Sequence, residues 1–440
     1  MMLNKTVIGA AIAAAFISAL PAQAQSAKDF EEMRAEIKRL RAEVDALKKT
    51  APAAATPAAD STGWGDRIEA LEIKSKDAVV QGDTGGSFCL PGSETSLRFY
   101  GFAEGHAIHD LKQAGPSDTF TDLMFQPLDN AGGQKGKTKF TAQTSRFGFE
   151  SSTPTALGAF NTKLEMDFYS YGAGNRNRLR LRHAYGEYAG FLVGQTWSTF
   201  MDLDNLPETL DFNGPIGAPF SRRTMVRYTY ADSKAGFKLT AAIEDPEDQF
   251  GGGSANERLP QIVLRADKSF DWGAVNARVL FHEKRSFAET KRGFGVGIGG
   301  SYKITDKDLL MGQYTRVDGD IDQLYGSNGY SINVDQFDSA GVQTNVGTGA
   351  ISFDKNQGLV VGYAKTFSDQ WRGTVSYGMN RGKTAQAVDN RTLQQVFINV
   401  IYAPIKNVEL GAEYIHGKRK TFTPETGTMS RFDLIGRYSF

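Results

Sequence analysis

Apolar and polar residues alternate with a period of two along most of this chain, from about Ser96 to the C-terminus. Alternation of this kind is typical of β-strands that have one apolar and one polar face. The clearest strands are expected at 157–168, 275–282 and 396–402, with others near Phe237, Leu359, Val375 and Leu410. At roughly 20 to 22 residues per strand and connection, the ~345 residues of this region hold about 16 strands. We therefore predict an all-β transmembrane β-barrel of about 16 antiparallel strands over residues 96–440.

The last strand is the clearest single indication of a membrane barrel. One face carries Phe432, Leu434, Gly436, Tyr438 and Phe440, and the other carries Arg431, Asp433, Arg437 and Ser439. A membrane barrel must close its sheet with a last strand that faces lipid on one side, and this segment fits that role. The alternative interpretation is an edge strand of a soluble protein. The strand also resembles the signal read by the bacterial outer-membrane assembly machinery. We therefore expect Phe440 and Tyr438 to act as an assembly signal, with that machinery as a partner.

The first residues predict export from the cytoplasm. Lys5, the apolar stretch 7–20 and the small residues Ala22 and Ala24 have the order of a secretory signal peptide, which we place at residues 1–24. No later apolar stretch is long enough for a transmembrane helix. We expect a location in the outer membrane of a Gram-negative bacterium, with the N-terminal segment in the periplasm and the lipid bilayer and lipopolysaccharide around the barrel.

Residues 25–50 carry a heptad pattern that predicts a short α-helical coiled coil. Its apolar seam consists of Phe30, Met33, Ile37, Leu40, Val44 and Leu47. Ile37 and Val44 at the a positions with leucines at d favour a dimer, although we prefer a trimer for the whole protein. A single amphipathic helix is the alternative, because about three heptads are marginal in isolation.

Residues 51–95 predict a semi-extended Ala/Pro linker followed by a short helix. This places residues 25–95 in the periplasm, where peptidoglycan is a further candidate partner.

Composition narrows the function. Lys and Arg number 50 and Asp and Glu also number 50, which predicts no nucleic-acid partner. Cys89 is the only cysteine, so no disulfide can form within the chain. A barrel of about 16 strands encloses an aqueous channel, and the polar insertions 113–139 and 318–356 are expected to be extracellular loops.

An arginine ladder is the segment most suggestive of function. Strand alternation places Arg178, Arg180 and Arg182 on the lumenal face, and Arg223 and Arg227 follow on a later strand. Guanidinium groups bind carboxylate or phosphate bidentately, so a ladder of them can pass an anion from one site to the next. The alternative is that these arginines only balance lumenal acids such as Glu165 and Asp167.

The segment 201–220 contains Asp202, Asp204, Glu208 and Asp211 and follows about five strands. A general porin folds a loop into its lumen at this point. We therefore expect these carboxylates to shape a constriction and to face the arginines of the wall across it.

The stretches 180–188 and 193–202, continuing to Gly214 and Pro215, resemble the DcaP-type outer-membrane porins. The resemblance extends over essentially the whole chain and is most specific at 193–202. It implies a homotrimer of 16-stranded barrels with an N-terminal periplasmic coiled coil, passing small anionic solutes such as dicarboxylates. The heptad pattern of residues 25–50, which favours a dimer, agrees least well with the trimer that this resemblance implies. Phosphate-selective porins, which also have a coiled coil and an arginine ladder, are the nearest competitor.

Other kinds of function are less well supported. The acidic stretch 318–322 is compatible with Ca²⁺ but is more simply a solvated loop, and we predict no metal site and no cofactor. Five scattered histidines and the lack of catalytic motifs predict that the chain is not an enzyme. A structural tether between the outer membrane and the cell wall is the alternative of another class. Closely spaced lumenal arginines argue against the tether, because like charges repel.

Overall fold

The structure is a computed structural model that describes residues 81–82, 85–112, 120–131, 135–170, 178–246, 257–320, 322–324, 326, 329–333, 336–337, 343–383, 390–423 and 425–440. The expected signal peptide, the coiled-coil seam and most of the expected linker and short helix lie outside the described residues and stay predictions. In the described part, no helix has the length and apolar character needed to cross a membrane.

The chain forms two units. One comprises residues 1–81 and 89–94, where the Cys89 thiol donates to the Gln81 carbonyl over 3.8 Å. The other comprises residues 82–88 and 95–440 and contains the barrel. The short elements outside the barrel wall are β1 (Phe88–Cys89), η1 (Leu123–Phe125), η2 (Asp129–Ala131), β14 (Tyr330–Ile332), β15 (Gln336–Phe337), β16 (Gln343–Asn345) and β17 (Ile351–Phe353).

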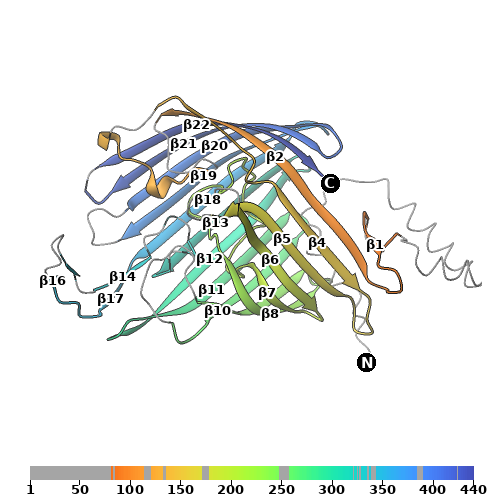
Figure 1. Cartoon of the computed structure of the whole chain (residues 1–440), viewed down its shortest axis with the longest axis horizontal. Coiled ribbons are helices and arrows are strands. Elements are labelled where there is room, and N and C mark those ends of the chain that lie inside the picture. The colour runs from red at the N-terminus through yellow and green to blue at the C-terminus, as the bar shows by residue number, and fades with distance from the viewer. Residues whose placement is uncertain are drawn as a thin grey trace, which may run out of the picture. The chain divides into compact units, whose positions relative to one another are not determined.

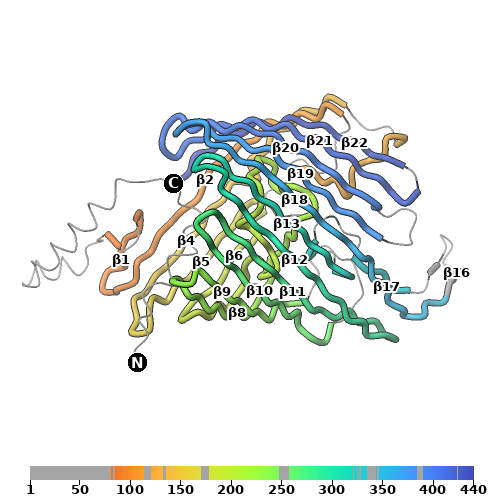
Figure 2. Tube along the Cα trace, turned by 180° about the vertical axis from the view of Figure 1, so that it is seen from behind, coloured from red at the N-terminus to blue at the C-terminus, as the bar shows by residue number. Residues whose placement is uncertain are grey.

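The barrel is a closed ring of sixteen antiparallel strands, which confirms the fold and strand number expected from the sequence (Figures 1 and 2). The strands are β2 (Ser96–Lys112), β3 (Lys137–Thr141) with β4 (Arg146–Thr153), β5 (Phe160–Ser170), β6 (Arg178–Tyr188), β7 (Phe191–Trp197), β8 (Arg222–Asp232), β9 (Phe237–Glu244), β10 (Gln261–Phe270), β11 (Gly273–Arg285), β12 (Thr290–Thr305), β13 (Asp308–Asp318), β18 (Lys355–Thr366), β19 (Trp371–Lys383), β20 (Asn390–Ile405), β21 (Val408–Thr421) and β22 (Thr426–Ser439). β3 and β4 count as one interrupted strand, because both pair with β2. β5 begins at Phe160 rather than at Leu157, which lies in the preceding turn.

β22 pairs with β2 and so closes the ring. The Phe440 amide donates to the Gly101 carbonyl over 3.0 Å, and the Gly101 amide donates back to Phe440 over 3.2 Å. The two faces of β22 differ as the alternation predicts: Leu434 is 53% exposed, whereas Asp433 is 1% exposed. An apolar exterior and a polar interior follow from this alternation in every strand of the wall.

The two ends of the barrel differ in their connections. One end has short turns, such as Ala189–Gly190, where Gly190 adopts φ 87° and a Cβ would lie 2.8 Å from the Thr229 carbonyl oxygen. The other end has long segments, and described parts of three of them pack inside the barrel rather than lying only outside it. These inward parts are 120–127, 198–221 and residues 320, 322–324 and 326, which supply Leu123, Phe200, Leu210, Ile216 and Leu324 to the buried apolar clusters.

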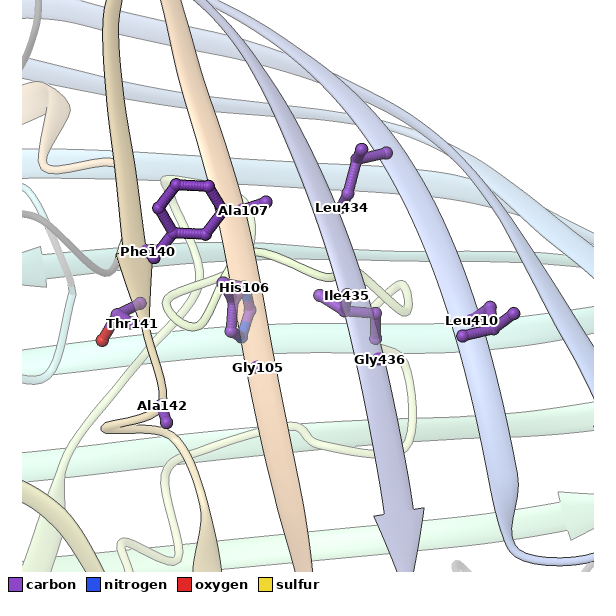
Figure 3. Close-up of a pocket in the computed structure, with 10 residues that line it drawn as sticks. All are labelled: Gly105, His106, Ala107, Phe140, Thr141, Ala142, Leu410, Leu434, Ile435 and Gly436. Carbon is purple, nitrogen blue, oxygen red and sulfur yellow. The ribbon is translucent and has the colours of Figure 1, made fainter.

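The outer surface has an apolar depression of about 610 Å³ over β2, β3, β21 and β22 (Figure 3). Small residues such as Gly105 and Gly436 form its floor, and Phe140 and Leu434 stand beside it. Phe140 is 81% exposed and Leu434 53% exposed, as outward-facing side chains of a membrane barrel are. The depression therefore belongs to the exterior and is separate from the lumenal path of a solute.

Candidate pore constriction

The segment 198–221 connects β7 to β8 and is called the constriction loop below. The Ser198 amide donates to the Ser221 carbonyl over 3.0 Å, so the two ends of the loop meet at its base. Between them the chain crosses the lumen to the opposite wall, where Gly217 adopts φ 95°. A Cβ at Gly217 would lie 2.1 Å from the Met379 carbonyl oxygen, so only glycine allows this close approach to β19.

Three apolar side chains anchor the constriction loop to the wall. Phe200 packs in a cluster with Val263, Leu280 and Leu324, and Leu210 packs with Ile401 and Ile435. Ile216 packs with Leu123, Leu393 and Phe397 in a third cluster. Phe200 and Ile216 are fully buried and Leu210 is 5% exposed. These contacts hold the start, middle and end of the loop at three separate places in the lumen.

Polar side chains of the wall bind the backbone of the same loop. Glu244 on β9 accepts hydrogen bonds from the Ser198 hydroxyl and the Thr199 amide, both at 2.7 Å. Glu413 on β21 accepts the amides of Leu210 at 3.0 Å and Asp211 at 2.8 Å. Backbone N–H groups of a buried loop need partners, and these carboxylates provide them.

The loop carboxylates do not face the arginines that the sequence suggested. Asp202 lies 3.7 Å from Arg265 on β10 and 3.9 Å from Arg278 on β11, and it accepts hydrogen bonds from Asn205 and Asn276. Asp204 lies 3.3 Å from Arg265. The predicted pairing is therefore wrong for both residues, because the loop crosses the lumen before these side chains reach the wall.

Glu208 and Asp211 also do not face the predicted arginines. Glu208 contacts β19, and Asp211 contacts the first inward segment, 120–127. Glu208 forms a bidentate pair with Arg372, with both nitrogen–oxygen distances at 2.9 Å. Asp211 accepts the amide of Thr121 at 2.6 Å and that of Asn213 at 3.0 Å. Burial raises the pKa of the Asp211 carboxyl from 3.8 to about 6, because desolvation disfavours its charged form.

The arginine ladder faces the lumen but is paired with neighbouring acids. Arg180 binds Asp167 through two nitrogens at 3.0 and 2.6 Å. Arg182 binds Glu165 at 2.7 Å and Asp167 at 3.0 Å. The contacts thus agree with the alternative in which lumenal acids balance these two arginines. Arg178 is the exposed first residue of β6.

A β-bulge adds a lumenal side chain beside this ladder. Glu165 pairs with His183, whereas the next residue, Met166, pairs with Leu181. Arg182 is therefore the extra residue, and both Arg182 and His183 are buried. Leu179 and Leu181, which are 53% and 43% exposed, face outward as the alternation predicts.

Arginines and aromatic rings alternate along this side of the constriction. The members of this arginine–aromatic column are Tyr169, Arg180, Phe212, Arg182, Trp197 and Arg222. Phe212 belongs to the constriction loop, and its ring centroid lies 5.4 Å from the Arg180 guanidinium and 5.8 Å from that of Arg182. A cation over an aromatic face is stabilised by about 0.5–2 kcal/mol. The column thus docks the loop against the ladder through an aromatic ring rather than through a carboxylate.

Arg223 and Arg227 have different surroundings. Arg223 is 2% exposed and lies 3.3 Å from Asp322 and 3.8 Å from Asp320, in the third inward segment. It is therefore covered and lies away from a solute path, contrary to expectation. Arg227 is half-buried on the lumenal face of β8, and none of the described carboxylates lies within 4.0 Å of it.

The wall from β4 to β8 carries more lumenal cations than carboxylates in the described part of the chain. Apart from Arg223, which lies beside Asp320 and Asp322, the cations are Arg146, Lys163, Arg180, Arg182, Arg222 and Arg227, and the carboxylates are Glu150, Glu165, Asp167 and Glu187. The constriction-loop carboxylates do not offset this excess, because arginines of β10, β11 and β19 neutralise three of them. In the part of the chain that the structure describes, no cluster of three His, Cys, Asp or Glu side chains could hold a metal ion.

Sequence reasoning did not assign roles to Arg265, Arg372, Glu244, Glu413 or Phe212. Alternation marks the four strand residues as inward-facing, but the constriction-loop partners of Glu244 and Glu413 lie 45 and 203 positions away. Phe212 lies in a loop, and its arginine partners are 30 and 32 positions away. The alternation of apolar and polar residues does not indicate which strand a given loop residue will contact.

Comparisons with known proteins agree with this geometry. The model of the DcaP outer membrane protein family matches residues 71–440. The crystal structure of the outer membrane channel DcaP of Acinetobacter baumannii matches with a TM-score of 0.70 at 28% identity, covering 82% of this chain and 100% of that chain. A search of curated proteins found no match.

Two more distant porins share the fold. The anion-selective porin from Comamonas acidovorans has a TM-score of 0.56 at 12% identity, covering 79% of this chain and 100% of that chain. The trimer form of OmpT of Vibrio cholerae has a TM-score of 0.52 at 16% identity, with coverages of 79% and 99%.

Proposed function

We propose that this chain passes small anionic solutes such as dicarboxylates through an arginine-lined constriction. The chain belongs to the DcaP outer membrane protein family and is therefore a porin of the Gram-negative outer membrane. The observation that carries the proposal is the arginine–aromatic column beside the constriction loop. Its guanidinium groups belong to a part of the wall that has an excess of positive charge. Three carboxylates of the constriction loop are paired with arginines of β10, β11 and β19.

Anion passage follows from this charge distribution. A cleft lined with one sign of charge raises the local concentration of the opposite ion. Arg180 and Arg182 use part of their donors on Glu165 and Asp167, so a passing carboxylate meets partly satisfied guanidinium groups. Binding is then weak enough for the solute to leave again, which conduction requires.

Phosphate is the second candidate solute. A guanidinium fork binds carboxylate and phosphate with similar geometry, so the column alone does not discriminate between them. Block of a chloride current by a dicarboxylate and by phosphate, measured in parallel, separates the two. We expect the dicarboxylate to block more strongly, because two carboxylates can engage Arg180 and Arg182 together.

The proposal also includes an assembly of three subunits. The trimer form of OmpT of Vibrio cholerae shares this fold, and we expect this chain to form a homotrimer in a bilayer containing lipopolysaccharide. Phe440, which pairs with Gly101 at the barrel seam, is expected to be needed for insertion by the outer-membrane assembly machinery. The N-terminal segment is proposed to lie in the periplasm near peptidoglycan.

Reversal potentials in a planar bilayer under a KCl gradient test the selectivity. Wild type is expected to prefer chloride. Replacing Arg178, Arg180 and Arg182 together by alanine should shift the preference toward potassium, because Asp167 loses both of its arginine partners and Glu165 keeps only Arg146, at 3.4 Å, as an arginine partner. A matched variant that removes three outward-facing cations, Arg381→Gln, Lys383→Gln and Lys418→Gln, should keep the wild-type ratio.

Unchanged selectivity in the triple alanine variant would refute the role of the column. A cation-selective wild type would refute anion transport itself. The absence of any conductance in a folded protein would favour the tether instead.

A further inference from the structure

The exterior of the barrel carries a group of cations at the end with the long segments. This group, called the basic girdle here, consists of Lys355 on β18, Arg381 and Lys383 on β19, and Lys418 and Lys420 on β21. Strand alternation turns them outward, because their neighbours Asn356 and Asn380 are buried in the lumen. On β21 the Arg419 guanidinium donates inward to the Gln126 carbonyl, so Lys418 and Lys420 point the other way.

Strand register brings the members of the girdle close together. Lys355 pairs directly with Lys383, and Arg381 pairs with Thr392, which in turn pairs with Lys420. Neighbouring strands lie about 4.8 Å apart, so the β19 and β21 cations are separated by roughly 10 Å. The girdle therefore presents two groups of positive charge on one continuous face of the sheet.

Among the residues that the structure describes, the girdle cations have no carboxylate partner. No described carboxylate lies within 4.0 Å of any of its five cations, and like charges directly opposite each other on adjacent strands are destabilising. Two other outward-facing cations are paired: Lys365 lies 2.7 Å from Asp308, and Arg316 lies 3.3 Å from Asp318. A bound anion that is not part of the protein would reduce the electrostatic repulsion among the girdle cations.

The height of the girdle places it beside lipid headgroups. Trp371 and Arg381 are both outward-facing on β19, and the ten residue steps from one to the other span about 33 Å. With a strand tilt of about 40°, this corresponds to a height of about 25 Å, the thickness of the apolar band of a membrane barrel. Trp371 stacks on Tyr402 at 4.5 Å and marks the opposite interface. The girdle thus lies just above the outer-leaflet acyl chains, since long loops are extracellular.

The girdle lies on the part of the wall from β18 to β21. At the long-segment end of β9 and β10 the outward-facing residues include Ile243 and Ile262, which are 55% and 47% exposed. β11 and β12 carry Arg285 and Arg292 at this end, and Arg292 lies 3.7 Å from Glu283. The girdle cations differ from Arg292 because no described carboxylate lies within 4.0 Å of them.

We propose that the basic girdle binds a phosphorylated glycolipid of the outer leaflet, with one phosphate at Lys355, Arg381 and Lys383 and a second at Lys418 and Lys420. A headgroup with two phosphates on a rigid sugar core matches two groups of cations about 10 Å apart better than a lipid with one phosphate. The acyl chains would lie against the apolar strand faces directly below, which include Val375, Val396 and Ile398.

Binding of fluorescent bisphosphorylated lipid A to the purified full-length protein in neutral detergent tests the proposal. The variant Arg381→Gln, Lys383→Gln, Lys418→Gln, Lys420→Gln should bind at least about tenfold more weakly, and salt should weaken wild-type binding. The matched control Lys234→Gln, Lys303→Gln, Lys307→Gln, Lys406→Gln removes four exposed cations at the other end and should bind like wild type.

Competing lipids identify the ligand. Dephosphorylated lipid A and phosphatidylglycerol should compete poorly with the bisphosphorylated form. Equal competition by phosphatidylglycerol or by inorganic phosphate would show a general anion surface and overturn the assignment. If the control variant lost as much lipid A binding as the girdle variant, the assignment of the binding site to the basic girdle would be wrong.

A second measurement keeps the proposal testable if the fourfold variant folds poorly. Lys383→Gln alone should raise the melting temperature in lipid-free detergent, because it removes the repulsion from Lys355. The gain should vanish when bisphosphorylated lipid A is present. Single-channel selectivity should remain that of wild type, so failure of this proposal is distinguishable from failure of anion transport.

Discussion

Two groups of strands in the lumenal wall use arginine differently. On β6 and β8 the guanidinium groups of Arg180, Arg182 and Arg222 alternate with aromatic rings and keep a net positive charge beside the constriction. On β10 and β19 those of Arg265 and Arg372 are paired with carboxylates of the constriction loop.

This difference shows that an inward-facing arginine is not by itself a solute site. What matters is whether a carboxylate of the loop reaches it. Under the proposed function, the loop contributes to selectivity in two ways: it narrows the lumen, and its carboxylates pair with the arginines of β10 and β19 but not with those of β6. Variants that change the loop position or its pairing should therefore alter this asymmetry.

Removing the apolar anchors should have the largest effect. The variant Phe200→Ala, Leu210→Ala, Ile216→Ala loses about 2–5 kcal/mol of packing at each site, which exceeds what the remaining hydrogen bonds of the loop can offset. We expect a clear rise in single-channel conductance and a weaker ion preference, because the loop leaves the lumen.

The control for this variant is Leu179→Ala with Leu181→Ala, two outward-facing changes that leave the lumen intact. Wild-type conductance in the folded anchor variant would mean that loop packing does not define the constriction.

Freeing the loop carboxylates should have an intermediate effect. In the variant Arg265→Gln, Arg372→Gln, the side chains of Asp204 and Glu208, which are 55% and 43% exposed, lose their partners in the lumen. The reversal potential should shift toward cations, because two negative charges become uncompensated beside the path.

Adding Asp204→Asn and Glu208→Gln to that variant should restore the anion preference. A fourfold variant that stays cation-shifted would show that the arginines themselves, rather than the released carboxylates, set selectivity on this side.

The smallest effect concerns pH and Asp211. Burial raises the pKa of this carboxyl from 3.8 to about 6, so the folded protein holds its proton more tightly than the unfolded chain. The stability from this group is fully present below pH 3.8 and is lost as the pH rises through about 6. Asp211→Asn should therefore flatten the dependence of the melting temperature on pH between about 4 and 6.

The control is Asp204→Asn, which changes an exposed loop carboxylate and should leave the pH slope of the melting temperature as it is in wild type. An identical slope in wild type and Asp211→Asn would show that the buried carboxyl does not titrate in this range.

Much of the wall could be predicted from the sequence, whereas most of the constriction could not. Alternation located the outward faces of β5, β8 and β22 and the inward direction of Arg180 and Arg182, because side-chain direction in a strand depends only on position parity. It did not reveal that Arg182 is the extra residue of a bulge, since a bulge depends on register with the neighbouring strand.

The sequence alone therefore determined the class of fold, the strand number and the inward direction of Arg180 and Arg182. These properties are local and periodic, and each is repeated along many strands. Only the tertiary structure decided that Glu208 meets Arg372, that Phe212 lies between Arg180 and Arg182, and that Asp322 covers Arg223. Such contacts depend on where a loop lands after barrel closure, and no short stretch of sequence encodes that position.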